Sequence, residues 1–115
     1  MKALLCMLLL AFTFQAEAAT KTLLFCKNID QDDLKTITIQ KNANIKAEGL
    51  LELLEQHTDG SKKDLMATSQ DLEDGYVPMS SHDGTERILL RRNGKWTVAG
   101  IKGDYRFFSN ADCVE

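Results

Sequence analysis

Residues 85–108, TERILLRRNGKWTVAGIKGDYRFF, contain the strongest structural signal in this chain. Asn93-Gly94 lies between two apolar segments, and this dipeptide is typical of a tight hairpin because both central residues accept a positive φ. Gly103-Asp104 predicts a second tight turn, of type II′, with Gly103 at its first central position. We therefore expect a three-stranded antiparallel meander over this segment. The predicted cross-strand pairs are Arg92 with Lys95, Arg91 with Trp96, Leu90 with Thr97, Leu89 with Val98, Lys102 with Tyr105 and Ile101 with Arg106.

The remainder of the chain also reads as a series of short strands. Turn signals recur about every 8–12 residues, which is typical of an all-β sandwich or barrel. Threonine and isoleucine alternate within residues 34–41, as expected for a half-buried strand. Pro78 places residues 76–79 at the edge of a sheet, because proline lacks the amide hydrogen of an interior strand. Further strands are expected at residues 22–27 and 63–69.

Residues 47–57 are compatible with two structures. Their leucines and His57 fit the apolar face of a helix. Gly49 and the absence of a capping box argue against a helix, and the turn sequence of residues 58–61 favours a hairpin. We expect a strand here. The alternative is an α+β fold with a helix near residues 45–57.

The first 18 residues predict a secretory signal peptide. Lys2, the apolar run of residues 3–14 and the small-residue site Ala16-Glu17-Ala18 are its three usual parts. The apolar run is shorter than the roughly 20 residues that a membrane-spanning helix needs. Cleavage after Ala18 would leave residues 19–115, enough for a single β-rich domain. We therefore expect an exported monomer, periplasmic or secreted, with no transmembrane segment after cleavage.

Cleavage would also remove Cys6 and leave Cys26 and Cys113 as the remaining cysteines. Two cysteines in an oxidising compartment usually pair. A disulfide requires Cα atoms within about 7 Å, so the first and last segments must lie side by side. We therefore predict an all-β fold, a small antiparallel meander or up-and-down barrel of six to eight strands, with one disulfide. Closure of the barrel would remove exposed strand edges.

No complete catalytic or metal-binding motif occurs in the sequence. Residues 80–83, Ser-Ser-His-Asp, contain the residue types of a hydrolase triad, but neighbours in one loop do not align nucleophile, base and orienting acid. Asn28, Asp30 and Asp32 resemble the start of a calcium loop that lacks its glycine and its final glutamate. We expect no enzymatic activity, no cofactor and no metal. A small hydrolase that uses His57 or His82 is the least favoured alternative.

Charge is distributed unevenly along the chain. Residues 28–83 contain 5 lysines and 12 acidic residues, whereas residues 85–106 contain 6 basic and 2 acidic residues. We predict that this basic, Trp-bearing hairpin binds an acidic partner, either a protein or an anionic envelope polymer, but not nucleic acid, because the whole chain is acidic. The alternative is internal, with Arg91 stacked on Trp96. The predicted partner-binding residues are Arg87, Arg91, Arg92, Lys95, Trp96, Lys102 and Arg106.

Together these features favour an exported, non-enzymatic binding or inhibitor-like protein. The expected shape is similar to that of the bacterial periplasmic inhibitors of c-type lysozyme, a likeness of fold class that brings no inhibitory motif with it. The second hypothesis is a barrel that holds a small apolar ligand. A chain this short fills a narrow barrel with its own side chains, which counts against that hypothesis.

Overall fold

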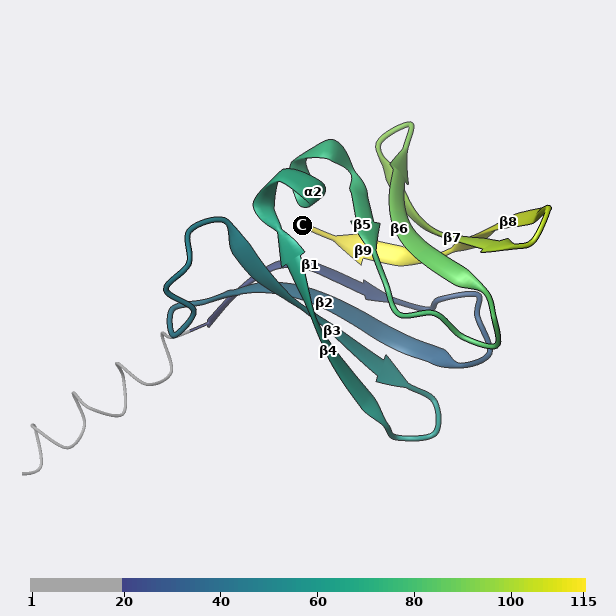
Figure 1. Cartoon of the computed structure of the whole chain (residues 1–115), viewed down its shortest axis with the longest axis horizontal. Coiled ribbons are helices and arrows are strands. Elements are labelled where there is room, and N and C mark those ends of the chain that lie inside the picture. The colour runs from purple at the N-terminus through teal and green to yellow at the C-terminus, as the bar shows by residue number, and fades with distance from the viewer. Residues whose placement is uncertain (1–19) are drawn as a thin grey trace, which may run out of the picture.

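Residues 20–115 are described by the computed structural model, in which they form nine strands and one short helix (Figure 1). The strands form two antiparallel sheets. The first sheet has the order β4-β3-β2-β1-β9 and contains β1 (Thr20–Lys27), β2 (Leu34–Asn42), β3 (Leu50–His57), β4 (Lys62–Thr68) and β9 (Asp112–Val114). The second has the order β5-β6-β7-β8 and contains β5 (Tyr76–Pro78), β6 (Glu86–Arg92), β7 (Lys95–Lys102) and β8 (Tyr105–Asn110). The predicted signal peptide, residues 1–18, lies outside the described residues.

The predicted all-β fold with one disulfide is confirmed. The ambiguous segment forms β3, whose side chains alternate between buried and half-buried positions, so the alternative with a helix near residues 45–57 is wrong. The described residues form nine strands where six to eight were expected, because the sheets include β5 and β9, each of only three residues. The strands form two sheets with free edges in place of the expected closed barrel. Pro78 lies in β5, which is an edge strand as predicted.

One short helix, α2 (Ser69–Asp74), begins at the residue where the strand expected at residues 63–69 would end. The Thr68 side chain accepts a hydrogen bond from the Asp71 amide and caps its start. Gly75 ends the helix in the left-handed conformation, with φ of 73°. These caps stabilise a single helical turn between β4 and β5.

The register predicted for residues 85–108 is confirmed. Asn93 and Gly94 have φ angles of 51° and 78°, as the central positions of a tight hairpin turn require. Gly103 has a φ of 60° at the second turn. The structure pairs Arg92 with Lys95, Arg91 with Trp96, Leu90 with Thr97, Leu89 with Val98, Lys102 with Tyr105 and Ile101 with Arg106.

The hydrophobic core lies between the two sheets. Figure 1 shows the second sheet lying across one face of the first. Full burial of a valine, leucine or isoleucine side chain contributes about 1.5–3 kcal/mol to the free energy of unfolding. The core residues of the first sheet include Leu24, Ile37, Ile39, Leu51 and Leu53, and those of the second are Val77, Leu89, Trp96 and Val98.

The Cys26–Cys113 disulfide joins β1 to β9, with the two Cα atoms 4.1 Å apart. The same two residues are direct cross-strand partners. Ala111 is the one residue between β8 and β9, so the chain passes there from the second sheet to the first. The prediction that the first and last segments lie side by side is therefore confirmed.

Replacing both disulfide cysteines by serine should lower the free energy of unfolding by about 4–5 kcal/mol, because the bond closes a loop of 87 positions. Urea unfolding of the oxidised protein and the Cys26→Ser/Cys113→Ser variant measures this loss. Reductant should lower the stability of the wild type to that of the variant and leave the variant unchanged. A loss below about 1 kcal/mol would show that β9 stays on the sheet without the covalent bond.

Gly100 on β7 should not tolerate a side chain, because a Cβ atom there would overlap the ring of Phe107 on β8. Overpacking of this kind costs about 1–3 kcal/mol. We expect Gly100→Ala to destabilise the protein by that amount in thermal unfolding, and to cost much less when Phe107→Ala is already present. Equal costs in the two backgrounds would contradict this account.

Candidate binding face

The second sheet has two faces of different character. Burial alternates along β6 and the first half of β7. The side chains that point towards the first sheet are Arg87, Leu89, Trp96 and Val98. The residues between them lie on the opposite face, which we call the outer face. Four of the seven predicted partner-binding residues therefore lie on the face of the second sheet that is turned towards the first sheet. They are Arg87, Arg91, Trp96 and Lys102.

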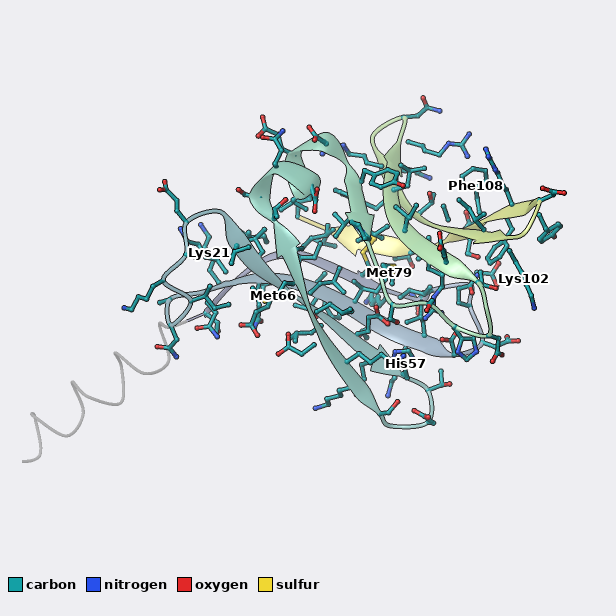
Figure 2. The ribbon with its side chains drawn as sticks, in the orientation of Figure 1. Lys21, His57, Met66, Met79, Lys102 and Phe108 are labelled. Carbon is teal, nitrogen blue, oxygen red and sulfur yellow. A yellow bond between two sulfur atoms is a disulfide. The ribbon has the colours of Figure 1, made fainter. Side chains whose placement is uncertain are left out.

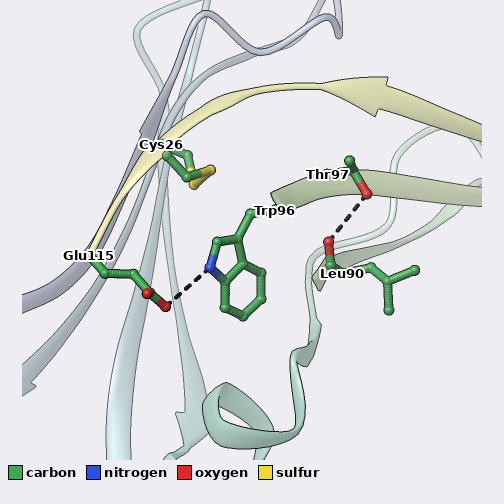
Figure 3. The surroundings of a disulfide bond; sticks show 6 residues. Cys26, Leu90, Trp96, Thr97 and Glu115 are labelled. Atoms are coloured by element: carbon green, nitrogen blue, oxygen red, sulfur yellow. Dashed lines mark hydrogen bonds between the residues drawn. A yellow bond between two sulfur atoms is a disulfide. The ribbon is translucent and has the colours of Figure 1, made fainter. Parts of the chain in front are cut away.

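Trp96 is 5% exposed and packs beside the disulfide (Figure 3). Its indole Nε1 donates a hydrogen bond to Glu115 Oε1 at 3.3 Å. The Arg91 guanidinium carbon lies 5.3 Å from the ring centroid, and this arginine also donates to the carbonyl oxygen of Glu73. This is the internal arrangement described above as the alternative, and it removes Trp96 from the accessible surface.

Arg87 is also removed from the accessible surface, because it is only 2% exposed. Its Nη1 donates to both carboxylate oxygens of Asp33, at 2.8 and 2.7 Å. Its Nη2 lies 3.8 Å from the buried carboxylate of Glu55, and its Nε donates to the carbonyl oxygen of Ser80. A buried arginine with two carboxylates around it serves as an internal counter-ion.

Both histidines lie next to these carboxylates, His57 as a buried residue and His82 as an exposed one. His57 Nε2 lies 3.0 Å from Glu55 Oε1, and its Nδ1 lies 3.5 Å from Asp33 Oδ2. His82 Nδ1 lies 3.6 Å from the same Asp33 oxygen. The Ser80 hydroxyl donates to Glu55 Oε1 at 2.5 Å. Serine and histidine of the Ser-Ser-His-Asp sequence thus contact different carboxylates, and the cluster connects β3 of the first sheet to β6 of the second.

The Asp33 carboxylate has a lowered pKa. Burial raises the pKa of this group, but the hydrogen bonds and charge of Arg87, with a smaller effect from His82, outweigh burial and hold the pKa below the ordinary value of 3.8. Asp33 is therefore ionised in the folded protein at neutral pH.

The outer face of the second sheet is largely apolar. Tyr76 is 50% exposed and Phe108 54% exposed. Figure 2 shows Phe108 on the side of β8 away from the first sheet. Between these rings lies a shallow depression of about 180 Å³. Its lining includes Tyr76, Ile88, Leu90, Ala99, Ile101, Arg106 and Phe108.

Three cations surround this apolar surface. Arg92 and Lys95 are paired beside the β6–β7 turn, and Arg106 lies opposite Ile101 on β8. The Arg92 guanidinium carbon lies 4.1 Å from the ring centroid of Phe108, so this cation lies directly over the aromatic surface. Within residues 20–115, none of these three side chains forms an ion pair.

Sequence reasoning missed the aromatic part of this face. Tyr76 and Phe108 occupy the same face as Leu90 and Ala99 in the observed register. The predicted register already placed Leu90 and Thr97 on the face opposite to Trp96. The sequence did not show which of these two faces is turned towards solvent. The candidate binding face is therefore defined by Tyr76, Leu90, Arg92, Lys95, Arg106 and Phe108.

No protein-family model, curated protein or solved structure matches this chain. In the part of the chain that the structure describes, no helix is long and apolar enough to span a membrane. The same residues contain no group of three or more histidine, cysteine or carboxylate side chains arranged to hold a metal ion. The proposed function therefore depends on the geometry of the sheets.

Replacement of Arg87 by methionine should lower the free energy of unfolding by about 3–5 kcal/mol, because Asp33 and Glu55 would lose their buried counter-ion. Chemical denaturation measures the change. Arg92→Met provides the matched control, since it removes an exposed arginine from the same strand, and its effect should be much smaller. Similar losses for the two variants would contradict the role assigned to Arg87.

Acid should weaken the fold through Asp33. Because folding lowers the pKa of Asp33, the ionised carboxylate stabilises the folded state fully above the ordinary pKa of 3.8. This stabilisation is lost as the pH falls through the lower pKa of Asp33 in the folded state. We expect the free energy of unfolding to fall more for the wild type than for Asp33→Asn between about pH 5 and about pH 2. Parallel pH profiles would show that the Asp33–Arg87 pair does not contribute.

Proposed function

We propose that this protein is an exported, non-enzymatic binding protein and that the candidate binding face takes up an acidic protein partner. The single observation that carries the proposal is the exposure of Tyr76 and Phe108 on a face with three cations that form no ion pair within residues 20–115. Exposed apolar patches bordered by polar residues are typical of protein interaction sites. The cations would select an acidic partner and speed its association.

The apolar centre of the face favours a protein over an anionic polymer. A polyanion would bind Arg92, Lys95 and Arg106 by charge and would gain little from the rings between them. A protein partner can bury an apolar side chain in the depression and place carboxylates at its rim. Aromatic and arginine side chains of this kind dominate the energy of protein interfaces.

Export is supported by two independent features. Residues 1–18 have the composition of a signal peptide. The Cys26–Cys113 disulfide is of the kind that persists in oxidising compartments. Because the protein would be exported, its partner would be in the periplasm or outside the cell.

Charge reversal at the candidate binding face tests the proposal. We expect Arg92→Glu/Lys95→Glu to reduce capture of the partner from a cell-envelope extract by at least about tenfold, measured by quantitative mass spectrometry of proteins retained on the immobilised domain. Lys62→Glu/Lys63→Glu is the matched control, because it reverses two exposed lysines on β4 of the other sheet. Capture by this control should equal that of the wild type.

Phe108→Ala separates a protein partner from a polymer. Loss of the ring should weaken capture of a protein strongly and leave binding of a polyanion nearly unchanged. If Arg92→Glu/Lys95→Glu and Phe108→Ala both retain the same molecules as the wild type, the candidate binding face is not an interaction site.

A further inference from the structure

The edges of the two sheets differ in how well they are protected. Natural sheets block their edges with charges, proline or very short strands, because a free edge pairs with other chains. In the described residues the edge strands are β4, β9, β5 and β8. β4 begins with Lys62-Lys63-Asp64, β9 has three residues, and β5 has three residues including Pro78.

β8 lacks these protections. It extends over six residues, Tyr-Arg-Phe-Phe-Ser-Asn, with three aromatic residues and a single charge at Arg106. Tyr105 is 67% exposed, and Phe108 is similarly open. This edge adjoins the candidate binding face, because Arg106 and Phe108 belong to both.

The register shows which backbone groups of β8 face outward. Lys102 and Tyr105 flank a two-residue turn and form the hydrogen-bonded pair that closes the hairpin. Hydrogen-bonded pairs then alternate along the ladder, so Arg106, Phe108 and Asn110 direct their N–H and C=O groups to the free edge. The Asn110 carbonyl oxygen accepts a hydrogen bond from the Asp30 amide at 2.9 Å, in agreement with this assignment.

We propose, building on the proposed function, that the acidic partner binds as an extended strand added to the free edge of β8. The contact with Asp30 occupies the Asn110 end, which leaves the outward groups of Arg106 and Phe108 for the incoming strand. Main-chain hydrogen bonds supply affinity in this mode, and alternate side chains supply specificity. On the outer face, those side chains meet Phe108 and the cations Arg106 and Arg92.

Charge selects a foreign acidic strand over a second copy of this chain. Pairing of β8 with itself would bring two basic hairpins together, each with 6 basic and 2 acidic residues between positions 85 and 106. Like charges on neighbouring strands are destabilising. Arg106 and Phe108 lie two positions apart on the outer face, so a strand with an acidic and an apolar residue two positions apart places both on that face to meet them.

The probe is a short capped peptide of repeated Glu-Thr-Val-Thr, which places glutamate and valine on the same face of a strand, labelled for fluorescence anisotropy with the full exported domain. Two N-methylated forms test the pairing, because alternate amides of an added strand point in opposite directions. N-methylation of one alternate set should weaken binding at least about tenfold, and N-methylation of the other set should have little effect. Replacing glutamate by lysine should also weaken binding.

The protein-side test compares Arg106→Pro with Arg106→Ala. Both variants remove the cation, but only proline removes the outward amide, and it leaves the β7–β8 hydrogen bonds in place. Arg106→Pro should therefore bind the peptide more weakly than Arg106→Ala. Phe108→Pro against Phe108→Ala is the second pair, and intact disulfide and cooperative unfolding show that each variant is folded.

Three results would overturn the edge proposal. These are no detectable peptide binding, equal binding of both N-methylated forms together with equal affinities of the proline and alanine variants, or a dimer in sedimentation equilibrium that Arg106→Pro abolishes. Each leaves the capture experiment with Arg92→Glu/Lys95→Glu unaffected. If Arg92→Glu/Lys95→Glu loses capture while the peptide and proline tests fail, the candidate binding face is retained and strand addition is rejected.

Discussion

The pairing of Cys26 with Cys113 is the constraint on which the rest of the structure depends. It holds β9 against β1 directly after the chain leaves the second sheet, so it ties the two sheets together at the end of the chain. Trp96 packs beside this junction and donates to Glu115, the last residue. The same junction brings Asp30 next to the end of β8. The closure therefore fixes where the end of the second sheet meets the first.

The buried cluster around Arg87 is a second connection between the sheets. Burial of charged groups costs desolvation energy, and Arg87 offsets that cost for Asp33 and Glu55 through close contacts. Because Asp33 precedes β2 and Glu55 lies on β3, the arginine of β6 binds the first sheet at two points. These contacts are directional, whereas hydrophobic burial is not, so the arginine adds specificity to the alignment of the sheets.

The two faces of the second sheet explain why a basic hairpin can serve both structure and recognition. The inward side uses Arg87 as a counter-ion and Arg91 as a cover for Trp96. On the other side, Arg92 lies over Phe108, where solvent reaches both. Cations of one strand therefore have different roles according to the parity of their position, which is a direct consequence of the two-residue period of a β-strand.

Local chemistry determined the parts of this protein that depend on neighbours in the sequence. Asn93-Gly94 determined the hairpin and its register through positive φ angles, and two cysteines determined the closure. Only the tertiary structure decided which face of the hairpin is buried, because both faces carry apolar side chains and a period of two does not rank them. It also decided the burial of Arg87, whose partner Asp33 lies 54 positions away and supplies the compensating charge.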